Sequence, residues 1–313
     1  MKALNPHKVQ ILAAVFLVLA FLAFNSPQPT NSQTPLPTII IFPDGTVSPS
    51  SAPIQQNGNT YTFTDNLYAA IKIQKSNIIL DGAGYTLSGP YNGTATNNWA
   101  IGNGPDQDPN GTFAQYIIGI DLASPNVEGI TIENLNVKNF SICMYIWTKN
   151  NTVTGNALSD SIVGILVSGS NQTVTKNYIA NNQQGLFFGF NNKEGTIPSD
   201  VVINHNDFEK NVVQLSGCGC KSPNASEPGH YWDDGRQGNF WSDYNGTDTN
   251  GDGIGNTPYV IDVLNQDRYP LMQSPVKLPV PAAKVPIEDI VLTVSAFAIG
   301  IVVVVVYKRR KKA

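Results

Sequence analysis

The sequence is short of charge, cysteine, histidine and methionine, and each shortage argues against a class of function. Charged side chains make up 13% of the 313 residues, about half the fraction usual for a soluble globular protein. No basic stripe occurs before the last six residues, which argues against a nucleic-acid surface. With three cysteines, three histidines and three methionines, we expect neither a disulfide framework nor a copper cofactor.

The three cysteines fall in two settings. Cys143 lies in an apolar segment, where we expect a buried core residue. Cys218 and Cys220 form a CGC motif. We favour a local disulfide or two free thiols for this motif, with a soft-metal site that includes His230 as the alternative.

Both ends of the chain carry apolar runs that predict export and membrane attachment. Residues 9–24 are rich in apolar side chains, which is typical of a signal peptide over residues 1–25, with a retained signal anchor as the alternative. Residues 290–307 carry no charge and, at about 1.5 Å per residue, are long enough to cross a bilayer as a helix. Five cations follow at 308–312. Because basic residues stay on the cytoplasmic side, the sequence predicts a type I cell-membrane protein with a transmembrane helix over 289–307, a basic cytoplasmic tail over 308–313 and an extracellular ectodomain.

Two proline-rich segments and seven acceptor motifs agree with an extracellular location. Residues 26–37 predict a Pro/Ser/Thr-rich linker, and residues 273–288 predict an extended stalk that lifts the ectodomain off the membrane. Motifs for N-glycosylation occur at Asn92, Asn110, Asn139, Asn150, Asn171, Asn224 and Asn245. Several would arise by chance in a chain with 34 asparagines, so they only support the interpretation as a glycoprotein.

The middle of the chain repeats with a period of 21 residues. Val153 and Val174 begin the equivalent segments VTGNAL and VTKNYI. Ile132 stands one period earlier, and Ile203 follows Val174 after a longer, 29-residue coil. A second apolar segment repeats in phase, as CMYI, GILV and GLFF, with GIDL displaced by three further positions. Alternate positions, such as Val153 in the first segment and Ile165 and Val167 in the second, are expected to face inward, which is typical of strands.

A single repeat unit is too small to bury its apolar face alone, so the repeats are expected to stack with their strands parallel and in register. The result is an all-β solenoid of about seven to nine coils. Asn156, Asn177 and Asn206 occupy equivalent positions. We predict that they stack as a structural ladder of side-chain amides at one corner.

Three parts of the chain carry a resemblance to a known family. Residues 60–89, which contain IILDGAG, resemble the opening coils of NosD-like right-handed parallel β-helix proteins, which are common among archaeal surface proteins. NNTVTGN and NQTVTKN resemble the repeating corner motif of that family, and residues 238–262 followed by DRYPLM resemble its closing segment. The resemblance implies a right-handed parallel β-helix over residues 38–217 and a C-terminal cap over residues 218–272.

Acidic residues are scattered over the coils and form no pair that follows the 21-residue period. Hydrolysis of a glycosidic bond usually needs two carboxylates, and the acids of the coils are Asp81, Asp121, Asp160, Asp200 and Asp207. Asp160 and Asp200 could approach each other only if the 29-residue coil brought them together. A lyase would need an arginine base on the coils, yet the only arginines before the tail lie in the closing segment. We therefore assign no catalytic residue.

The stretch DTNGDGIGNTPY in the closing segment matches the start of a calcium loop. Asp248, Asn250 and Asp252 alternate with other residues and precede a glycine, so their oxygens can converge on one cation. This pattern predicts a structural Ca²⁺ ion, and an Asx-turn cluster without an ion is the alternative.

The rest of that loop departs from the complete motif. Ile254 would supply a backbone carbonyl, and Asn256 would supply a further oxygen. The glutamate expected at the twelfth position is replaced by Tyr259, which excludes an EF-hand. An aromatic cluster surrounds the loop, and we expect it to plug the open end of the solenoid in preference to binding sugar rings.

These features predict a membrane-anchored extracellular protein with a non-catalytic structural, adhesive or carbohydrate-binding role at the cell surface. Its expected partners are the membrane and polysaccharide or other cell-surface components. A polysaccharide lyase or hydrolase is the first alternative. The family resemblance adds a second alternative, copper delivery to an exported metalloenzyme, for which the soft ligands in reach are Cys218, Cys220 and His230.

Overall fold

The structure is a computed structural model that describes residues 36–92, 116–189, 197–217, 229–262 and 264–281. All of these residues belong to one unit of the chain, which begins at Leu36. They form 24 strands and contain no helix, and hence none that is long and apolar enough to cross a membrane. The predicted signal peptide (1–25), transmembrane helix (289–307) and basic tail (308–313) lie outside the described residues.

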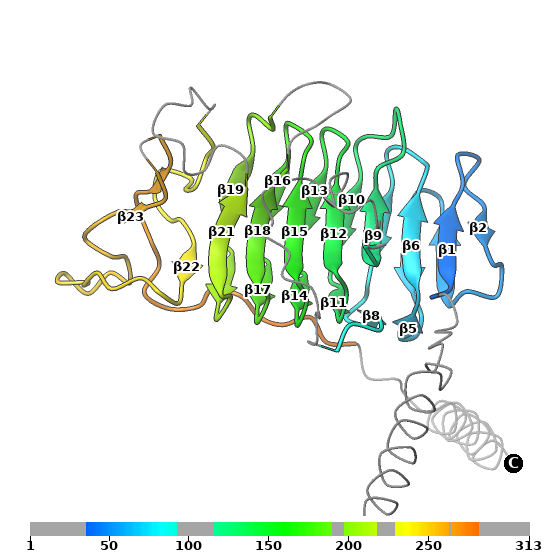
Figure 1. The fold of residues 1–313 in the computed structure, drawn as a ribbon, viewed down its shortest axis with the longest axis horizontal. Coiled ribbons are helices and arrows are strands. Elements are labelled where there is room, and N and C mark those ends of the chain that lie inside the picture. The colour runs from blue at the N-terminus through cyan, green and yellow to red at the C-terminus, as the bar shows by residue number, and fades with distance from the viewer. Residues whose placement is uncertain (1–35, 93–115, 190–196, 218–228, 263, 282–313) are drawn as a thin grey trace, which may run out of the picture. The chain divides into compact units, whose positions relative to one another are not determined.

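Three sheets run side by side along the molecule (Figure 1). Sheet A has the order β2 (Val47–Ser48), β1 (Thr38–Ile41), β6 (Ala70–Ile73), β9 (Ile118–Leu122), β12 (Ile142–Ile146), β15 (Val163–Val167), β18 (Gln184–Phe188) and β21 (Val213–Gly217). Sheet B has the order β3 (Ile54–Asn57), β4 (Thr60–Phe63), β7 (Ile79–Asp81), β10 (Thr131–Glu133), β13 (Thr152–Thr154), β16 (Thr173–Thr175) and β19 (Val202–Asn204). Sheet C has the order β5 (Leu67–Tyr68), β8 (Thr86–Ser88), β11 (Asn136–Lys138), β14 (Ala157–Ser159), β17 (Tyr178–Ala180), β20 (Asp207–Glu209) and β22 (Phe240–Trp241).

Within these three sheets the strands are parallel except at the first end of the solenoid, where β2 and β3 pair antiparallel with β1 and β4. The chain visits sheets B, C and A in turn, so each coil contributes one strand to each sheet. Val153 pairs with Ile132 on one side and with Val174 on the other, and Val174 pairs with Ile203. The predicted register, with its 21-residue steps and its longer last step, is confirmed. The all-β architecture of stacked parallel strands is confirmed with it, and it is consistent with a β-helix.

Alternation along each strand turns every second side chain into the core. The inward residues of successive coils form columns in which no member is more than 1% exposed, such as Leu80, Ile132, Val153, Val174 and Ile203 in sheet B and Leu87, Val137, Leu158, Ile179 and Phe208 in sheet C. Burial of each of these side chains contributes about 2 kcal/mol.

Cys143 lies in β12 and is buried, as predicted.

The corners of the coils repeat one backbone conformation. Residues with a left-handed φ near +60° recur at each corner, and one such column is Asn139, Asp160, Asn181 and Lys210. Asparagine, aspartate and glycine adopt this conformation at the least cost. The abundance of asparagine in the sequence therefore follows partly from the number of corners that the solenoid must turn.

The closing segment seals the last coil with aromatic rings. Strand β22 extends sheet C, and Trp241 stacks on Phe208 at 4.4 Å and on Tyr259 at 4.3 Å. Trp232 is 2% exposed and Trp241 is 1% exposed. These rings continue the apolar columns beyond the last coil, as expected for a plug. The antiparallel pair β23 (Tyr259–Val260) and β24 (Gln266–Asp267) completes the segment.

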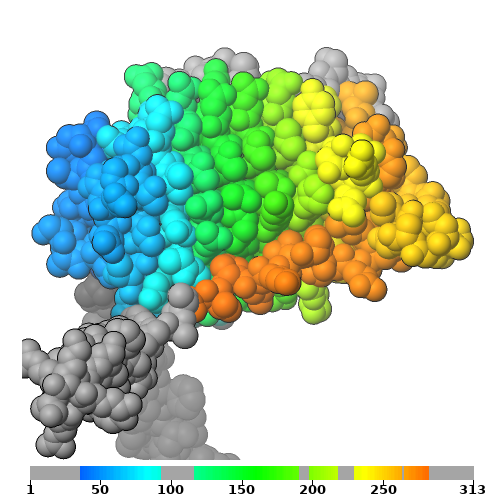
Figure 2. All heavy atoms as spheres, turned by 180° about the vertical axis from the view of Figure 1, so that it is seen from behind, coloured from blue at the N-terminus to red at the C-terminus, as the bar shows by residue number. Residues whose placement is uncertain are grey.

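The first part of the predicted stalk, residues 273–281, packs against the solenoid and is not a free spacer. Residues 273–281 do not lead away from the solenoid, because they run back along it from the cap toward the first coils (Figure 2). Ser274 bonds to Asp207, and Asn136 donates to the carbonyl of Pro279 at 3.0 Å. Sequence composition indicates an extended proline-rich conformation but carries no information on whether that segment docks. The remainder of the predicted stalk lies outside the described residues.

Candidate functional site

The asparagine ladder lies at the corner between sheets B and C. Asn156, Asn177 and Asn206 are fully buried in successive coils. Nδ2 of Asn156 donates to Oδ1 of Asn177 at 3.1 Å, and Nδ2 of Asn177 donates to Oδ1 of Asn206 at 3.0 Å. The backbone N–H groups of Asn156 and Asn177 donate to the same two oxygens at 3.0 Å. The stack satisfies the buried polar groups of the turns, and this structural role requires no ligand.

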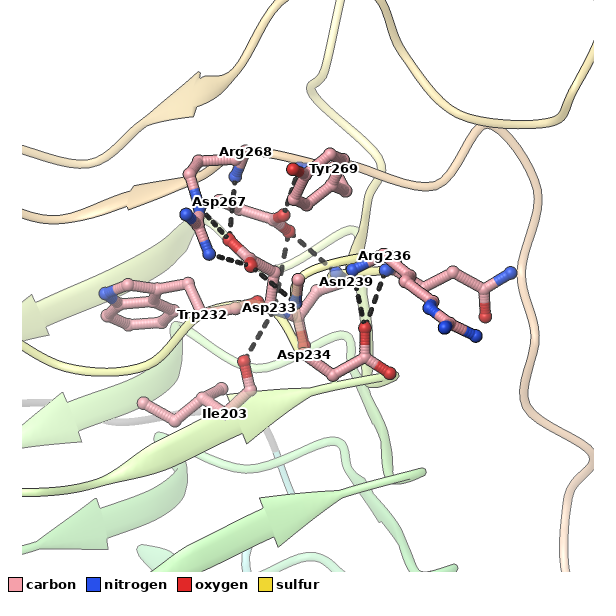
Figure 3. A network of polar contacts seen from close by, with 11 residues as sticks. Ile203, Trp232, Asp233, Asp234, Arg236, Asn239, Asp267, Arg268 and Tyr269 are labelled. Atoms are coloured by element: carbon pink, nitrogen blue, oxygen red, sulfur yellow. Dashed lines mark hydrogen bonds and ion pairs between the residues drawn. The ribbon is translucent and has the colours of Figure 1, made fainter.

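The ladder continues into the closing segment, an extension that the 21-residue period does not predict. Asn206 donates through Nδ2 to Oδ1 of Asn239 at 3.0 Å. The backbone N–H of Asn239 donates to Oδ2 of Asp267 at 2.7 Å, and Nε1 of Trp241 donates to the same oxygen at 2.9 Å. Oδ1 of Asp267 accepts the backbone N–H of Tyr269 at 3.0 Å (Figure 3). An ionised carboxylate only accepts hydrogen bonds, so Asp267 can end a chain of donors.

Asn239 and Asp267 escaped the sequence analysis because they do not follow the 21-residue period. Neither the step from Asn206 to Asn239 nor the step from Asn239 to Asp267 is a multiple of that period. Both residues are fully buried, and burial raises the pKa of Asp267 although four hydrogen bonds from Asn239, Trp241 and Tyr269 lower it. Their only signal in the sequence is their place in the closing segment.

A second polar link joins the two halves of the closing segment. Arg268 forms two parallel hydrogen bonds with Asp233, from Nε to Oδ2 at 2.9 Å and from Nη2 to Oδ1 at 2.5 Å. The side chain of Asp233 is 3% exposed. Burial alone would raise its pKa, but the bonds from Arg268 and Gly235 lower it below the ordinary value. Arg268 therefore links the two ends of the cap through a bidentate ion pair.

The predicted calcium loop is folded around Asp248. Oδ1 of Asp248 accepts the backbone N–H of Gly251 at 2.7 Å, and Oδ2 accepts that of Gly253 at 2.8 Å. Both glycines have a left-handed φ, +76° at Gly251 and +85° at Gly253. The bonds to Gly251 and Gly253 lower the pKa of Asp248, so this carboxyl is ionised well below neutral pH.

The other predicted ligands also hold the turn. Asp252 accepts the backbone N–H of Ile254 through Oδ1 at 2.9 Å and the amide of Asn250 through Oδ2 at 2.8 Å. Oδ1 of Asn256 accepts the backbone N–H of Thr249 at 2.6 Å. The carboxylate oxygens of Asp252 each have a further lone pair, which fits an oxygen-ligand cation. Oδ1 of Asn256 also accepts the hydroxyl of Thr249 at 2.8 Å, so it would have to release one of its two donors to bind a cation. Among the described residues no three His, Cys, Asp or Glu side chains gather closely enough to hold a metal by themselves, and backbone carbonyls would have to complete the shell.

The candidate soft-metal ligands are only partly described. Cys218 and Cys220 lie outside the described residues. The ring of His230 stacks on Phe188 at a centroid distance of 4.3 Å. Burial lowers the pKa of His230 to about 4, so its imidazole is neutral at physiological pH. This position is that of an aromatic packing residue at the end of the core.

The acids of the coils lie on different parts of the solenoid. Asp81 belongs to sheet B, Asp121 to sheet A and Asp207 to sheet C. Asp160 follows β14 at the corner between sheets C and A, whereas Asp200 precedes β19 at the corner between sheets A and B. The five-residue strands of sheet A separate these corners by roughly 17 Å, so the 29-residue coil does not bring Asp160 and Asp200 together.

Two pairs of acids do lie close together. Asp81 and Glu133 pair in register on neighbouring strands of sheet B, and Asp207 and Glu209 project from the same outer face of β20. Phe208 between them points into the core. Burial raises the pKa of Asp207 to about 6 although Ser274 lowers it. The bond from Lys210 lowers the pKa of Glu209. Two neighbouring carboxyls with pKa values displaced in opposite directions are a pattern found at acid–base sites, although Asp207 is fully buried here.

A concavity of about 780 Å³ lies at the corner between sheets C and A. The segment Gly89–Asn92 forms one wall, and the corner residues of the later coils form the other. Nε2 of Gln183 donates to the hydroxyl of Tyr91 at 3.2 Å and so connects the two walls. The sequence does not predict this concavity, because its walls come from parts of the chain that are far apart in sequence.

Four lining residues form one column across the concavity. Asn139, Asp160, Asn181 and Lys210 hold the same left-handed corner position in successive coils, with φ between 54° and 63°. They directly follow the strand residues Lys138, Ser159, Ala180 and Glu209, which pair in register. Their side chains therefore recur at about 4.8 Å, the spacing of neighbouring strands. Such a column presents amide donors and acceptors, one carboxylate and one ammonium group at regular intervals.

The predicted glycosylation acceptors are distributed along the surface. Asn92, Asn150, Asn171 and Asn245 are exposed, and Asn139 is half-buried in the wall of the concavity. Asn150 and Asn171 lie on adjacent coils, where Nδ2 of Asn171 donates to Oδ1 of Asn150 at 3.3 Å. Asn110 and Asn224 lie outside the described residues.

The sequence matches no protein-family model and no curated protein.

Proposed function

We propose that the protein is a membrane-anchored extracellular β-helix that binds an extended carbohydrate at the cell surface without cleaving it. The observation that carries this proposal is the column of four polar side chains across the concavity between sheets C and A. Sugars present hydroxyl groups that both donate and accept hydrogen bonds, and amide side chains offer matching groups. A regular spacing of these groups suits a polymer better than a single small molecule.

The composition of the concavity supports a polar ligand. Amides dominate its wall, and Tyr91 supplies one ring that can pack against the apolar face of a sugar. A purely structural or adhesive role at the cell surface would also be non-catalytic. In either of these roles the concavity would bind no ligand.

The cellular setting of the proposal rests on the sequence. The apolar run over residues 289–307, the cations after it and the signal-like N-terminus support a type I topology with the coils outside the cell. The right-handed winding follows from the strong preference of parallel strand crossovers for that hand. We also propose membership of the NosD-like group, on the strength of the opening, corner and closing motifs.

A structural Ca²⁺ ion in the cap is part of the proposal. Asp248, Asn250, Asp252 and Asn256 would supply side-chain oxygens, and Ile254 would supply its carbonyl. The ion would neutralise the carboxylates and fix the turn. It has no role in binding the carbohydrate, because the loop belongs to the closing segment and the concavity to the coils.

A polysaccharide hydrolase is the second candidate, and Asp207 with Glu209 is the observation in its favour. In such an enzyme the carboxyl with the raised pKa acts as the acid and the other as the base or nucleophile. Asp207 would first have to become accessible, because Ser274 covers it.

One experiment separates the two candidates. The full-length protein in detergent is applied to a glycan array, and the retained glycans are assayed for newly formed reducing ends. We expect binding without cleavage, and Asn181→Ala should weaken binding about tenfold, since one lost hydrogen-bonding contact costs about 1.4 kcal/mol. Asn171→Ala is the matched control, because Asn171 has the same left-handed φ at another corner.

Two results would contradict the proposal. Equal binding by Asn181→Ala and the wild type would remove the concavity as the site. Reducing ends that appear with the wild type and disappear with Glu209→Gln would establish the hydrolase.

A further inference from the structure

The segment Ser274–Pro281, called here the strap, runs along the outer side of sheet C. Its first residue, Ser274, donates from its hydroxyl to Oδ2 of Asp207 in β20. Near its other end, the carbonyl of Pro279 accepts Nδ2 of Asn136 in β11. Val280 lies against Gly84, which precedes β8. In Figure 2 the strap is the orange band that crosses the coils from the cap toward the cyan segment.

The length of the strap matches the distance that it covers. The contacts at Asp207 and Gly84 lie four coils apart, since β20, β17, β14, β11 and β8 are neighbours in sheet C. Four steps of about 4.8 Å amount to about 19 Å. The six steps from Ser274 to Val280, at about 3.1 Å each in a polyproline II conformation, also span about 19 Å. An extended proline-rich chain therefore meets the coils in a fixed register.

Outward-facing side chains of sheet C are buried in the row between the two contacts of the strap, which runs in register from Asn136 to Asp207. Asp207 and Ala157 are on the outer side of their strands, because the residues next to them, Phe208 and Leu158, are in the core. Even so, Asp207 is 0% exposed and Ala157 is 6% exposed. Outward-facing side chains are normally exposed to solvent in a sheet that is covered on one face only. Burial of Asp207 and Ala157 therefore indicates that another segment packs on this face.

The far end of this surface is shaped for a backbone. A Cβ atom on Gly84 would lie 2.0 Å from the carbonyl carbon of Val280, so only glycine allows the strap to approach so closely. Gly84 also has a left-handed φ of +81°. The position thus needs glycine for its own turn and for the contact with the strap.

We propose that the outer face of sheet C, defined by Gly84, Asn136, Ala157 and Asp207, is a docking surface for an extended proline-rich strand, and that the protein's own residues 274–281 occupy it. The surface contacts the hydroxyl of Ser274 at one end of the strap, and the carbonyl of Pro279 and the backbone of Val280 near the other end. Docking returns the chain from the cap to the opening coils of the solenoid. It also keeps the Asp207 carboxyl away from solvent.

Limited proteolysis of the full-length protein tests this assignment. Trypsin can cleave after Lys277 in the strap, and cleavage requires that segment to leave the sheet. We expect the Lys277–Leu278 bond to be cut at least about thirtyfold more slowly than in a synthetic peptide of residues 270–286. Ser274→Ala, which removes a hydroxyl from an exposed residue of the strap, should accelerate cleavage at least about threefold.

A glycine pair provides the steric test and its control. Gly84→Ala should accelerate cleavage at Lys277 at least about tenfold, because the new Cβ displaces Val280. Gly155→Ala introduces the same residue at a left-handed φ of +67°, where the nearest atom to the new Cβ is Oδ1 of Asn134 at 3.3 Å and no atom of the strap is near. It should leave cleavage at Lys277 unchanged. Cleavage after Lys72, which lies within β6 between two paired strands, reports on general unfolding in every variant. Wild-type cleavage at the rate of the free peptide, or equal rates in Gly84→Ala and Gly155→Ala, would overturn the proposal.

Discussion

Two buried carboxyl groups, Asp267 and Asp207, differ in the number of hydrogen-bond donors around them. Asp267 receives hydrogen bonds from two backbone N–H groups and an indole, and it ends the asparagine ladder as an acceptor. Asp207 is bonded through Oδ2 to Ser274, and its Oδ1 is buried with no hydrogen-bond partner among the described residues. Burial of an ionised carboxylate without enough donors is unfavourable. The protonated form of Asp207 is therefore favoured in the folded protein.

The burial of Asp207 predicts that the stability of the folded protein depends on pH. Burial, which Glu209 reinforces by its charge, raises the pKa of Asp207 from 3.8 to about 6 in the folded state. The folded protein then holds this proton more tightly than the unfolded chain, so the contribution is full below pH 3.8 and is lost as the pH rises through 6. At about 1.4 kcal/mol per pKa unit, the loss is at most roughly 3 kcal/mol.

Denaturant unfolding of the wild type and Asp207→Asn between pH 4 and 7 measures this effect. The variant should lose less stability over that range, because an amide does not ionise. Glu209→Gln is the neighbouring control, since Glu209 has a lowered pKa and should depend on pH in the opposite sense. A wild-type slope retained in Asp207→Asn would show that Asp207 does not titrate there.

At the scale of elements, the period made the coils predictable. Val153 and Val174 have equivalent surroundings, so their 21-residue spacing specifies which strands pair and which side chains face inward. The corner ladder followed from the same spacing. The cap, the concavity and the docked strap could not be predicted in this way, because each depends on one contact between distant residues that never recurs, such as Gln183 with Tyr91 or Ser274 with Asp207.

The loop around Asp248 makes a prediction for metal binding. If Ca²⁺ binds the folded loop at a concentration about 100 times its Kd, it stabilises the protein by about 2.7 kcal/mol. Millimolar Ca²⁺ should therefore raise the Tm of the full-length protein by several degrees relative to chelator. The double variant Asp248→Asn, Asp252→Asn removes two of the charges that hold a cation, and its Tm should be the same in both conditions. Equal Tm values for the wild type with Ca²⁺ and with chelator would contradict a structural calcium site.

At the scale of the whole molecule, stability is close to a sum over coils and the contacts between them. Each internal coil touches the coil before it and the coil after it through parallel pairs in all three sheets. The two ends are different, since antiparallel strands close one and aromatic rings close the other. Deletion of an internal coil should therefore leave both ends of the core covered, whereas deletion of either end would expose the core.

Deletion of residues 152–172 tests this view. It removes one 21-residue unit and joins Asn151 to Thr173, so Ile132 meets Val174, Val137 meets Ile179 and Met144 meets Leu186. Each new pair is apolar and inward-facing, and Oδ1 of Asn177 takes the place of Asn156 beneath the N–H of Leu135. We expect a folded β-rich protein with one cooperative transition at a lower denaturant midpoint, because one coil and one set of contacts are lost. Deletion of only residues 152–161 moves inward residues to corners and should abolish the transition in circular dichroism. If both deletions unfold the protein equally, the coils are not interchangeable units.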